Sequence, residues 1–196
     1  MEKKSYRKLR REEIDKLVAQ LCLADDWAKI DVDDGFSTEY IRDVRFSGTI
    51  KLGIFEKTFL LPGGVTKHSG LSHVTLCHVA VGDNCCIENI QNYIANYEIG
   101  EDSFIENVDE IVVTEKSRFG NGVAVSVLNE NGGREVLIND KLSAHLAYIA
   151  ALYRHYPNLI DKINAITEHY AEKHASEIGT IGKNVTILNT GSIKNV

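Results

Sequence analysis

Aliphatic residues recur at every sixth position in two parts of the chain. In the first part, the six-residue positions are Val81, Ile87, Tyr93, Ile99, Ile105 and Ile111, and five of these six residues are aliphatic. In the second part, they are Ile181, Ile187 and Ile193. A step of six fits neither the 3.6-residue period of a helix nor the alternation of a lone strand. The pattern therefore indicates a repeated structural unit rather than a series of separate elements.

A longer period of eighteen residues combines three of these six-residue steps. Residues 81–98 and 99–116 match at the pairs Gly82/Gly100, Ile87/Ile105, Glu88/Glu106 and Asn89/Asn107. A third copy begins at residue 181 and has Gly182, Ile187 and Asn189 at the matching positions. Three six-residue steps predict a turn of chain with three short faces and one inward aliphatic residue on each. Such turns have to stack, because one turn cannot bury its apolar side alone.

The pattern [IV]-G-x-[ND]-x-x resembles the hexapeptide-repeat superfamily, whose members are left-handed parallel β-helices and mostly trimeric acyltransferases. The clear match covers residues 81–116 and 181–196, and a weaker one lies upstream. The resemblance implies a mostly β fold with a left-handed parallel β-helix, an exception to the usual right-handed crossover. The whole chain also looks like the N-terminal part of a large, poorly characterised bacterial family of that type.

Two regions depart from the repeat. Residues 8–22 have apolar side chains at helical spacing and predict an N-terminal helix that covers the first turn. Between residues 119 and 177, Val123, Val125 and Val127 alternate before an Asn131–Gly133 turn, which predicts a β-hairpin. A helical pair follows on either side of Pro157.

We therefore predict four segments. Residues 1–40 form an N-terminal helix and cap, and residues 41–118 form the β-helix. Residues 119–177 form an inserted hairpin and helical pair, after which the β-helix resumes at 178–196. The chain stops at Val196, in the middle of a hexad. An open end would expose strand edges, so we expect that the repeat continues in a longer protein or that an oligomeric partner covers it.

Composition narrows the classes of function. The 196 residues carry a net charge of −6, which argues against a nucleic-acid-binding protein. Six basic residues within the first eleven are either a solvated helix start or a docking arm for an anionic partner. The sequence contains no apolar run or signal segment that would indicate a membrane partner or secretion. The four cysteines form no CxxC pair, so we expect reduced thiols and a cytoplasmic protein.

The resemblance implies a site in which a histidine accepts the proton of an attacking hydroxyl or amine, a role that suits the pKa of imidazole. His73 and His78 are the candidates for this catalytic role, with acyl-CoA or a sugar nucleotide as the cofactor or donor. Both histidines could instead be surface residues of a strand. The resemblance also implies a homo-oligomer, with a trimer favoured.

Two further hypotheses stay open. The stretch from His73 to Asn84 also looks like the zinc-binding stretch of γ-type carbonic anhydrases, but His78 lies one residue closer to Val81 than in that family. Residues 26–60 contain no histidine that could serve as a third ligand, so we expect no metal. Alternatively, the chain is a non-enzymatic solenoid scaffold that assembles through the apolar stripes of its inserted helices.

Overall fold

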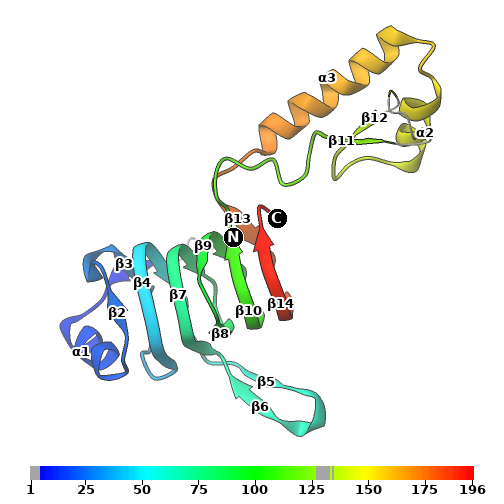
Figure 1. The fold of residues 1–196 in the computed structure, drawn as a ribbon. Helices are drawn as coiled ribbons and strands as arrows, with labels where there is room; N and C mark the ends of the chain where they lie inside the picture. The colour runs from blue at the N-terminus through cyan, green and yellow to red at the C-terminus, as the bar shows by residue number, and fades with distance from the viewer. Residues whose placement is uncertain (1–4, 127–132, 134) are drawn as a thin grey trace. The chain divides into compact units, whose positions relative to one another are not determined.

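A computed structural model describes residues 5–126, 133 and 135–196 of the chain. Lys3 and Lys4 of the basic cluster, Val127 of the expected hairpin, and Asn131 and Gly132 of its turn lie outside the described residues. The chain divides into two compact units (Figure 1). Unit 1 comprises Met1–Thr114 and Ile178–Lys194, and unit 2 comprises Glu115–Glu177 with Asn195–Val196.

Unit 1 is built mostly from β-strands that pair in parallel. Its elements are β1 (Tyr6–Lys8), α1 (Arg11–Ala19), β2 (Leu23–Ala24), a 3-10 turn (Trp27–Lys29), β3 (Ile30–Asp33), β4 (Ile41–Leu52), β5 (Thr58–Leu60), a second 3-10 turn (Pro62–Gly64), β6 (Thr66–His68), β7 (Gly70–Val81), β8 (Cys86–Ile90), β9 (Ile94–Ile99), β10 (Phe104–Val112), β13 (Gly179–Ile181) and β14 (Thr186–Lys194). All of these strands except β5 and β6 belong to one ten-stranded sheet. β5 and β6 form a separate antiparallel hairpin.

The strand pairing corrects the predicted fold class. β7 pairs with both β8 and β9, and β10 pairs with the same two strands, so the parallel sheet closes into a four-stranded barrel. The prediction of a left-handed parallel β-helix solenoid is therefore wrong, because solenoid turns stack in an open series and do not close a sheet on itself. The six-residue pattern identifies most of the side chains of unit 1 that face inward at its positions, but it does not determine which strands pair.

The eighteen-residue period is present in the register of the paired strands. Ile87 pairs with Ile105, which pairs in turn with Ile187. Ile87 and Ile105 are fully buried, and each contributes about 1.5–3 kcal/mol through burial of its side chain. The six-residue step fails at Tyr93, which is 38% exposed, whereas the next residue, Ile94, is fully buried and pairs with Ile111.

The bends of unit 1 place one residue each in the left-handed region of the backbone. These residues stand in three rows across the stacked strands: Asp43, His73, Asn89, Asn107 and Asn189; Gly48, His78 and Asn96; and Asn84, Asp102 and Asn184. Asparagine, aspartate and histidine adopt this conformation more readily than other residues with a side chain. We call these three sets the corner rows.

Unit 2 combines an antiparallel strand pair with two helices. Its elements are β11 (Val123–Ser126), β12 (Glu135–Ile138), α2 (Ala144–Leu152) and α3 (Pro157–His174). Pro157 stands at the first helical position of α3, where its missing N–H leaves no hydrogen bond unmade. A small core consists of Val136, Ala150 and Ala151, packed by Leu142 and Ile163. Among the described residues, no helix is both long enough and apolar enough to span a membrane.

Glu13 ties the start of α1 to the preceding strand. Its carboxylate accepts hydrogen bonds from both terminal guanidinium nitrogens of Arg7, at 2.8 and 2.7 Å, and from the backbone N–H of Arg10 at 2.7 Å. The hydrogen bonds from Arg7 are the largest cause that lowers the pKa of Glu13 below its ordinary value of 4.5. Because a depressed pKa favours the ionised carboxylate in the folded state, this pair stabilises the fold above pH 4.5.

Mutation can test whether Ile94, and not Tyr93, is the residue that faces the core. Ile94→Ala should lower the free energy of unfolding by about 2–5 kcal/mol, because it leaves a cavity in the core. Tyr93→Ala should cost less than half as much, because Tyr93 is partly exposed. Urea denaturation of both variants measures the difference, and a larger loss for Tyr93→Ala would contradict the register.

The pH dependence of stability tests the contact of Glu13. The stabilisation that Glu13 contributes should disappear as the pH falls below 4.5 through its lowered pKa in the folded state. The wild-type chain should therefore lose more melting temperature between pH 7 and pH 3 than the Glu13→Gln variant does. Thermal unfolding at both pH values gives the comparison, and equal losses would show that the pair does not stabilise the fold.

Candidate functional site

A cleft with a volume of about 310 Å³ lies where β4, β6, β7 and β8 meet in unit 1. The polar side chains that line it include Tyr40, Arg42, Lys67, His68, His73 and Glu88. Tyr40 lies in the turn directly before β4 and Arg42 is the second residue of β4, whereas Lys67 and His68 end β6. The cleft thus brings together histidine, lysine, arginine and carboxylate groups from four separate strands.

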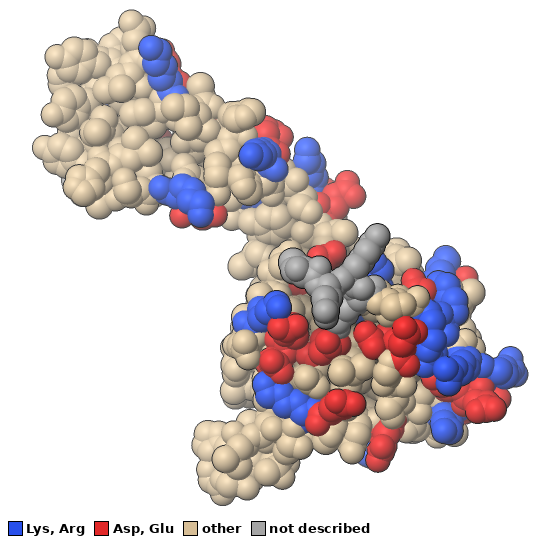
Figure 2. Space-filling view, turned by 180° about the vertical axis from the view of Figure 1, so that it is seen from behind, with Lys and Arg blue, Asp and Glu red and all other residues tan. Residues whose placement is uncertain are grey.

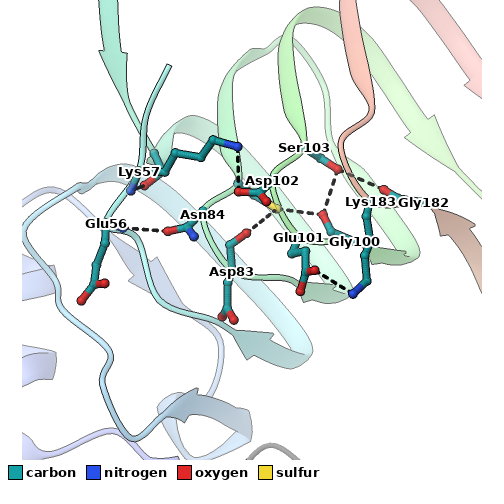
Figure 3. A network of polar contacts seen from close by, with 12 residues as sticks. Glu56, Lys57, Asp83, Asn84, Gly100, Glu101, Asp102, Ser103, Gly182 and Lys183 are labelled. Carbon is teal, nitrogen blue, oxygen red and sulfur yellow. Dashed lines mark hydrogen bonds and ion pairs between the residues drawn. The ribbon is translucent and has the colours of Figure 1, made fainter. Parts of the chain in front are cut away.

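The β5–β6 hairpin is held on the barrel at its base, and this fixes where Lys67 and His68 lie. Lys57 Nζ lies 2.8 Å from Asp102 Oδ1, and the side-chain oxygen of Asn84 accepts a hydrogen bond of 3.0 Å from the backbone N–H of Glu56 (Figure 3). The ring of Phe59 packs edge-on against Phe104, with their centroids 5.1 Å apart. The hairpin therefore has both polar and apolar attachment points beside the cleft.

Lys67 bridges two carboxylates that lie side by side on paired strands. Its Nζ donates to Glu88 at 2.6 Å and to Glu106 at 2.8 Å. Partial burial of the ammonium group opposes its ionisation, but the hydrogen bonds to Glu106 and Glu88 outweigh this effect and raise the pKa of Lys67. A lysine that stays charged in this way can position the hairpin, and it is a poor proton acceptor at neutral pH.

His68 is held in one orientation and in one tautomer. Its Nδ1 lies 2.8 Å from the carbonyl oxygen of Ser69. A carbonyl oxygen can only accept, so Nδ1 carries the hydrogen, and Nε2 is the acceptor nitrogen of the neutral ring. The ring also stacks on Tyr40, with the centroids 3.4 Å apart and the planes 13° from parallel. This arrangement prepares Nε2 to accept a proton, as a general base must do.

The structure separates the two histidines that the sequence singled out. His73 lines the same cleft as His68 and also a second hollow of about 350 Å³. It is a corner-row residue, its side chain is 53% exposed, and its Nε2 lies 3.8 Å from Asp43 Oδ2, too far for a hydrogen bond. His73 is therefore placed beside a candidate base, and its ring is not held by a hydrogen bond to Asp43.

His78 lies in a different corner row and does not line the cleft. Its ring covers Gly48, where any side chain would overlap the imidazole. Its Nδ1 lies 2.9 Å from Thr49 Oγ1. These contacts give His78 a packing role at a bend, and its assignment as a catalytic residue stays a prediction.

The sequence did not indicate His68 as a base, because one group that holds its ring is distant in the sequence and the other is part of the backbone. Tyr40 lies in the turn before β4, far from His68 in the sequence, and the carbonyl of Ser69 is a backbone group. The one signal in the sequence was the Pro62–Gly64 break in the repeat, which marks a loop beside the paired strands.

The described residues of the cleft supply neither an activated thiol nor a group of metal ligands. Cys86 lines it, but burial raises the pKa of the Cys86 thiol to about 12, so the nucleophilic thiolate is scarce at neutral pH. Within the described part of the chain, no three or more His, Cys, Asp or Glu residues are grouped so that they could hold a metal ion. The hypothesis of a zinc site therefore has no ligand set among these residues.

Comparison with known proteins gives a family for this arrangement. The family model described as a domain of unknown function, DUF4954, matches residues 6–196. This chain belongs to the DUF4954 family. An uncharacterized protein of Treponema pallidum (strain Nichols) is 28% identical over 204 residues, and the alignment covers 98% of this chain but 28% of that protein. The DUF4954 chain thus spans little more than a quarter of the length of this relative. No solved structure matches it.

Alkylation of the native DUF4954 chain tests how accessible its thiols are. Cys77 is partly exposed, whereas Cys22, Cys85 and Cys86 are buried. With iodoacetamide at pH 8, Cys77 should be modified first, and Cys85 and Cys86 should react only after unfolding, because burial also raises the pKa of Cys85 to about 11. Peptide mass spectrometry over time measures the rates. If Cys86 reacted as fast as Cys77, its thiol would have to be more exposed than the cleft geometry indicates.

Proposed function

We propose that this chain carries a group-transfer site in the cleft beside the β5–β6 hairpin, with His68 as the general base. The observation that carries the proposal is the double restraint of the His68 ring, by the Ser69 carbonyl and by Tyr40. A base whose ring is already oriented loses little freedom when the substrate binds, and this favours proton transfer in the transition state.

In the proposed reaction, Nε2 of His68 takes the proton of an acceptor hydroxyl or amine. The acceptor oxygen or nitrogen then forms a bond to the transferred group, and the bond between that group and its carrier breaks. The carrier leaves with the electron pair of the broken bond, and the imidazolium of His68 returns the proton to it. The side chain of Arg42, which lines the same cleft, supplies a positive charge for an anionic part of the donor.

The proposed class of donor is based on the six-residue sequence pattern. It is not based on the predicted fold class, which the structure corrects. The six-residue pattern resembles enzymes that use acyl-CoA or act on sugar nucleotides, so we propose one of these as the donor. A cytoplasmic location and a homo-oligomeric state are parts of this proposal.

Histidine variants separate the proposed base from the other candidates. His68→Gln should lower turnover of the donor by about 10²–10⁴-fold, while the KM for the donor changes little, because the base acts on the acceptor. The dependence of the rate on pH should differ between the wild type and His68→Gln, because the variant has no general base at this position. A screen of acetyl-CoA, longer acyl-CoAs and sugar nucleotides by thermal shift provides the donor for these assays.

The control variant is His78→Asn, since asparagine fills the same corner row and tolerates its backbone conformation. It should keep the wild-type rate and pH profile. His73→Asn is matched in the same way and reports whether the second histidine of the cleft contributes. A rate that fell in His78→Asn and not in His68→Gln would overturn the assignment of His68. Binding of neither donor class would overturn the transferase proposal itself.

A second candidate function is assembly without catalysis. It is favoured by the large apolar side chains that unit 2 leaves exposed, among them Tyr148, Leu152, Tyr153 and Tyr156. Under this hypothesis, the stacked strands of unit 1 would be a support, and all variants at the cleft would leave the biological role of the chain unchanged.

A further inference from the structure

The β5–β6 hairpin carries lysine side chains only at its base. Residues 58–66 contain no lysine, arginine, aspartate or glutamate, and Lys57 and Lys67 stand at the two ends of this stretch. Figure 2 shows the hairpin as an uncharged lobe at the bottom of the view, with charged side chains gathered where it joins the rest of unit 1. Of the two lysines, Lys67 is the one on the strand that carries His68.

Lys67 lies between two carboxylates that would otherwise repel each other. Glu88 of β8 and Glu106 of β10 are register partners on parallel strands, and neighbouring strands lie about 4.8 Å apart. Like charges at paired positions destabilise a sheet. The Nζ atom of Lys67 donates to both carboxylates, at 2.6 and 2.8 Å, and so removes this repulsion. The bridge thus joins β6 to two strands of the barrel at once.

The bridge is partly shielded from solvent. The side chains of Lys67 and Glu88 are each 27% exposed, and that of Glu106 is 18% exposed. Salt screens partly buried pairs less than exposed ones. The pair of Lys183 and Glu101, elsewhere in unit 1, is a single contact with side chains 60% and 42% exposed. Loss of Lys67 should therefore have a larger local effect than loss of Lys183.

His68 lies between two attachments of the chain to the barrel. After His68, the backbone N–H of Gly70 donates to the carbonyl oxygen of Cys85 at 2.8 Å. Before His68, the attachment is the side chain of Lys67, the residue directly preceding it. The His68 ring is therefore restrained from one side by backbone hydrogen bonds and from the other by the bridge.

The platform on which the His68 ring stacks has an attachment of its own. The carbonyl oxygen of Tyr40 accepts a hydrogen bond of 2.9 Å from the backbone N–H of Leu71 in β7. β5 is also attached separately, through its aromatic contact with β10. Loss of the Lys67 bridge would therefore leave Tyr40 and β5 in place and would free the end of β6 to move relative to the Tyr40 ring.

We propose that Lys67 is a positioning residue for His68. Its bridge holds the end of β6 so that the imidazole stays on the Tyr40 ring, with Nε2 as the acceptor nitrogen. The bridge also keeps Glu88, which lines the same cleft, engaged with an ammonium group, so that His68 is the proton acceptor there. An effect of Lys67 on a rate rests on the proposed function, whereas its effect on the His68 ring can be measured without a substrate.

Nitrogen-15 NMR of histidine-labelled protein tests the state of the ring, because it distinguishes the two neutral tautomers. At about pH 8, above the usual pKa of histidine, the His68 signals are identified by their absence in His68→Gln. They should show the hydrogen on Nδ1 and ring protons shifted upfield by Tyr40. In Lys67→Met, the tautomer mixture should move toward hydrogen on Nε2, and the ring protons should move toward their positions in Tyr40→Ala. Lys67→Arg should restore both, because a guanidinium can also bridge two carboxylates.

The matched control is Lys183→Met, which removes the same side chain from the exposed pair with Glu101 and should leave the His68 signals unchanged. A second variant, Lys67→Met with Glu106→Gln, loses the bridge without leaving two adjacent carboxylates to repel each other. Its His68 signals should move as they do in Lys67→Met. Signals that stayed at their wild-type positions in either Lys67→Met variant, or that moved equally in Lys183→Met, would overturn the positioning role.

A substrate from the donor screen adds a second measurement. Lys67→Met should lower turnover about 10–10²-fold with little change in KM, because a small displacement of the base weakens proton transfer. Unchanged turnover alongside altered His68 signals would overturn His68 as the base and leave the positioning of its ring supported. Failure of the transferase proposal and failure of the positioning role are therefore seen separately.

Discussion

The stacked strands of unit 1 depend on bends that hold one residue in the left-handed region of the backbone. For residues with a side chain this conformation costs about 1–2 kcal/mol, so the positions are filled mainly by asparagine, aspartate, glycine and histidine. Polar side chains at a bend can also bond to the next strand, as Asn107 Nδ2 does to Asn189 Oδ1 at 3.1 Å. With the bends fixed in rows, neighbouring aliphatic residues such as Ile87 and Ile105 come into register and are buried together.

The same constraint changes the interpretation of the histidines. His73 and His78 fill corner-row positions that hold asparagine, aspartate or glycine in neighbouring strands, so backbone geometry alone accounts for a histidine at either position. His68 ends β6, outside the corner rows, and its ring is restrained by Tyr40 and the Ser69 carbonyl instead. The backbone conformation does not require this restraint of the His68 ring. The restraint therefore supports a chemical role better than the mere presence of a histidine at a repeat position does.

The sequence predicted the spacing of the buried rows better than it predicted their connection. Steps of eighteen residues correctly relate Ile87 to Ile105, because each strand repeats the choice of inward residue. Tyr93 was misassigned because one residue fewer separates Ile94 from Ile111, and in a β-strand a shift of one residue reverses the face. The closed pairing of β7, β8, β10 and β9 depends on long-range hydrogen bonds that periodicity does not encode. The stacking of Tyr40 on His68 was inaccessible for the same reason.

Unit 2 interrupts the chain without disturbing the register of unit 1. Ser117 and Ser176 exchange backbone hydrogen bonds of 2.8 and 2.9 Å, so the inserted segment leaves and returns at neighbouring points. After it, β13 pairs with β9 and β14 pairs with β10 in continuous register. The strand register of unit 1 therefore continues across an insertion whose ends are hydrogen-bonded to each other. All residues that line the cleft belong to unit 1, so the candidate base and the groups that hold it are formed without residues of the inserted segment.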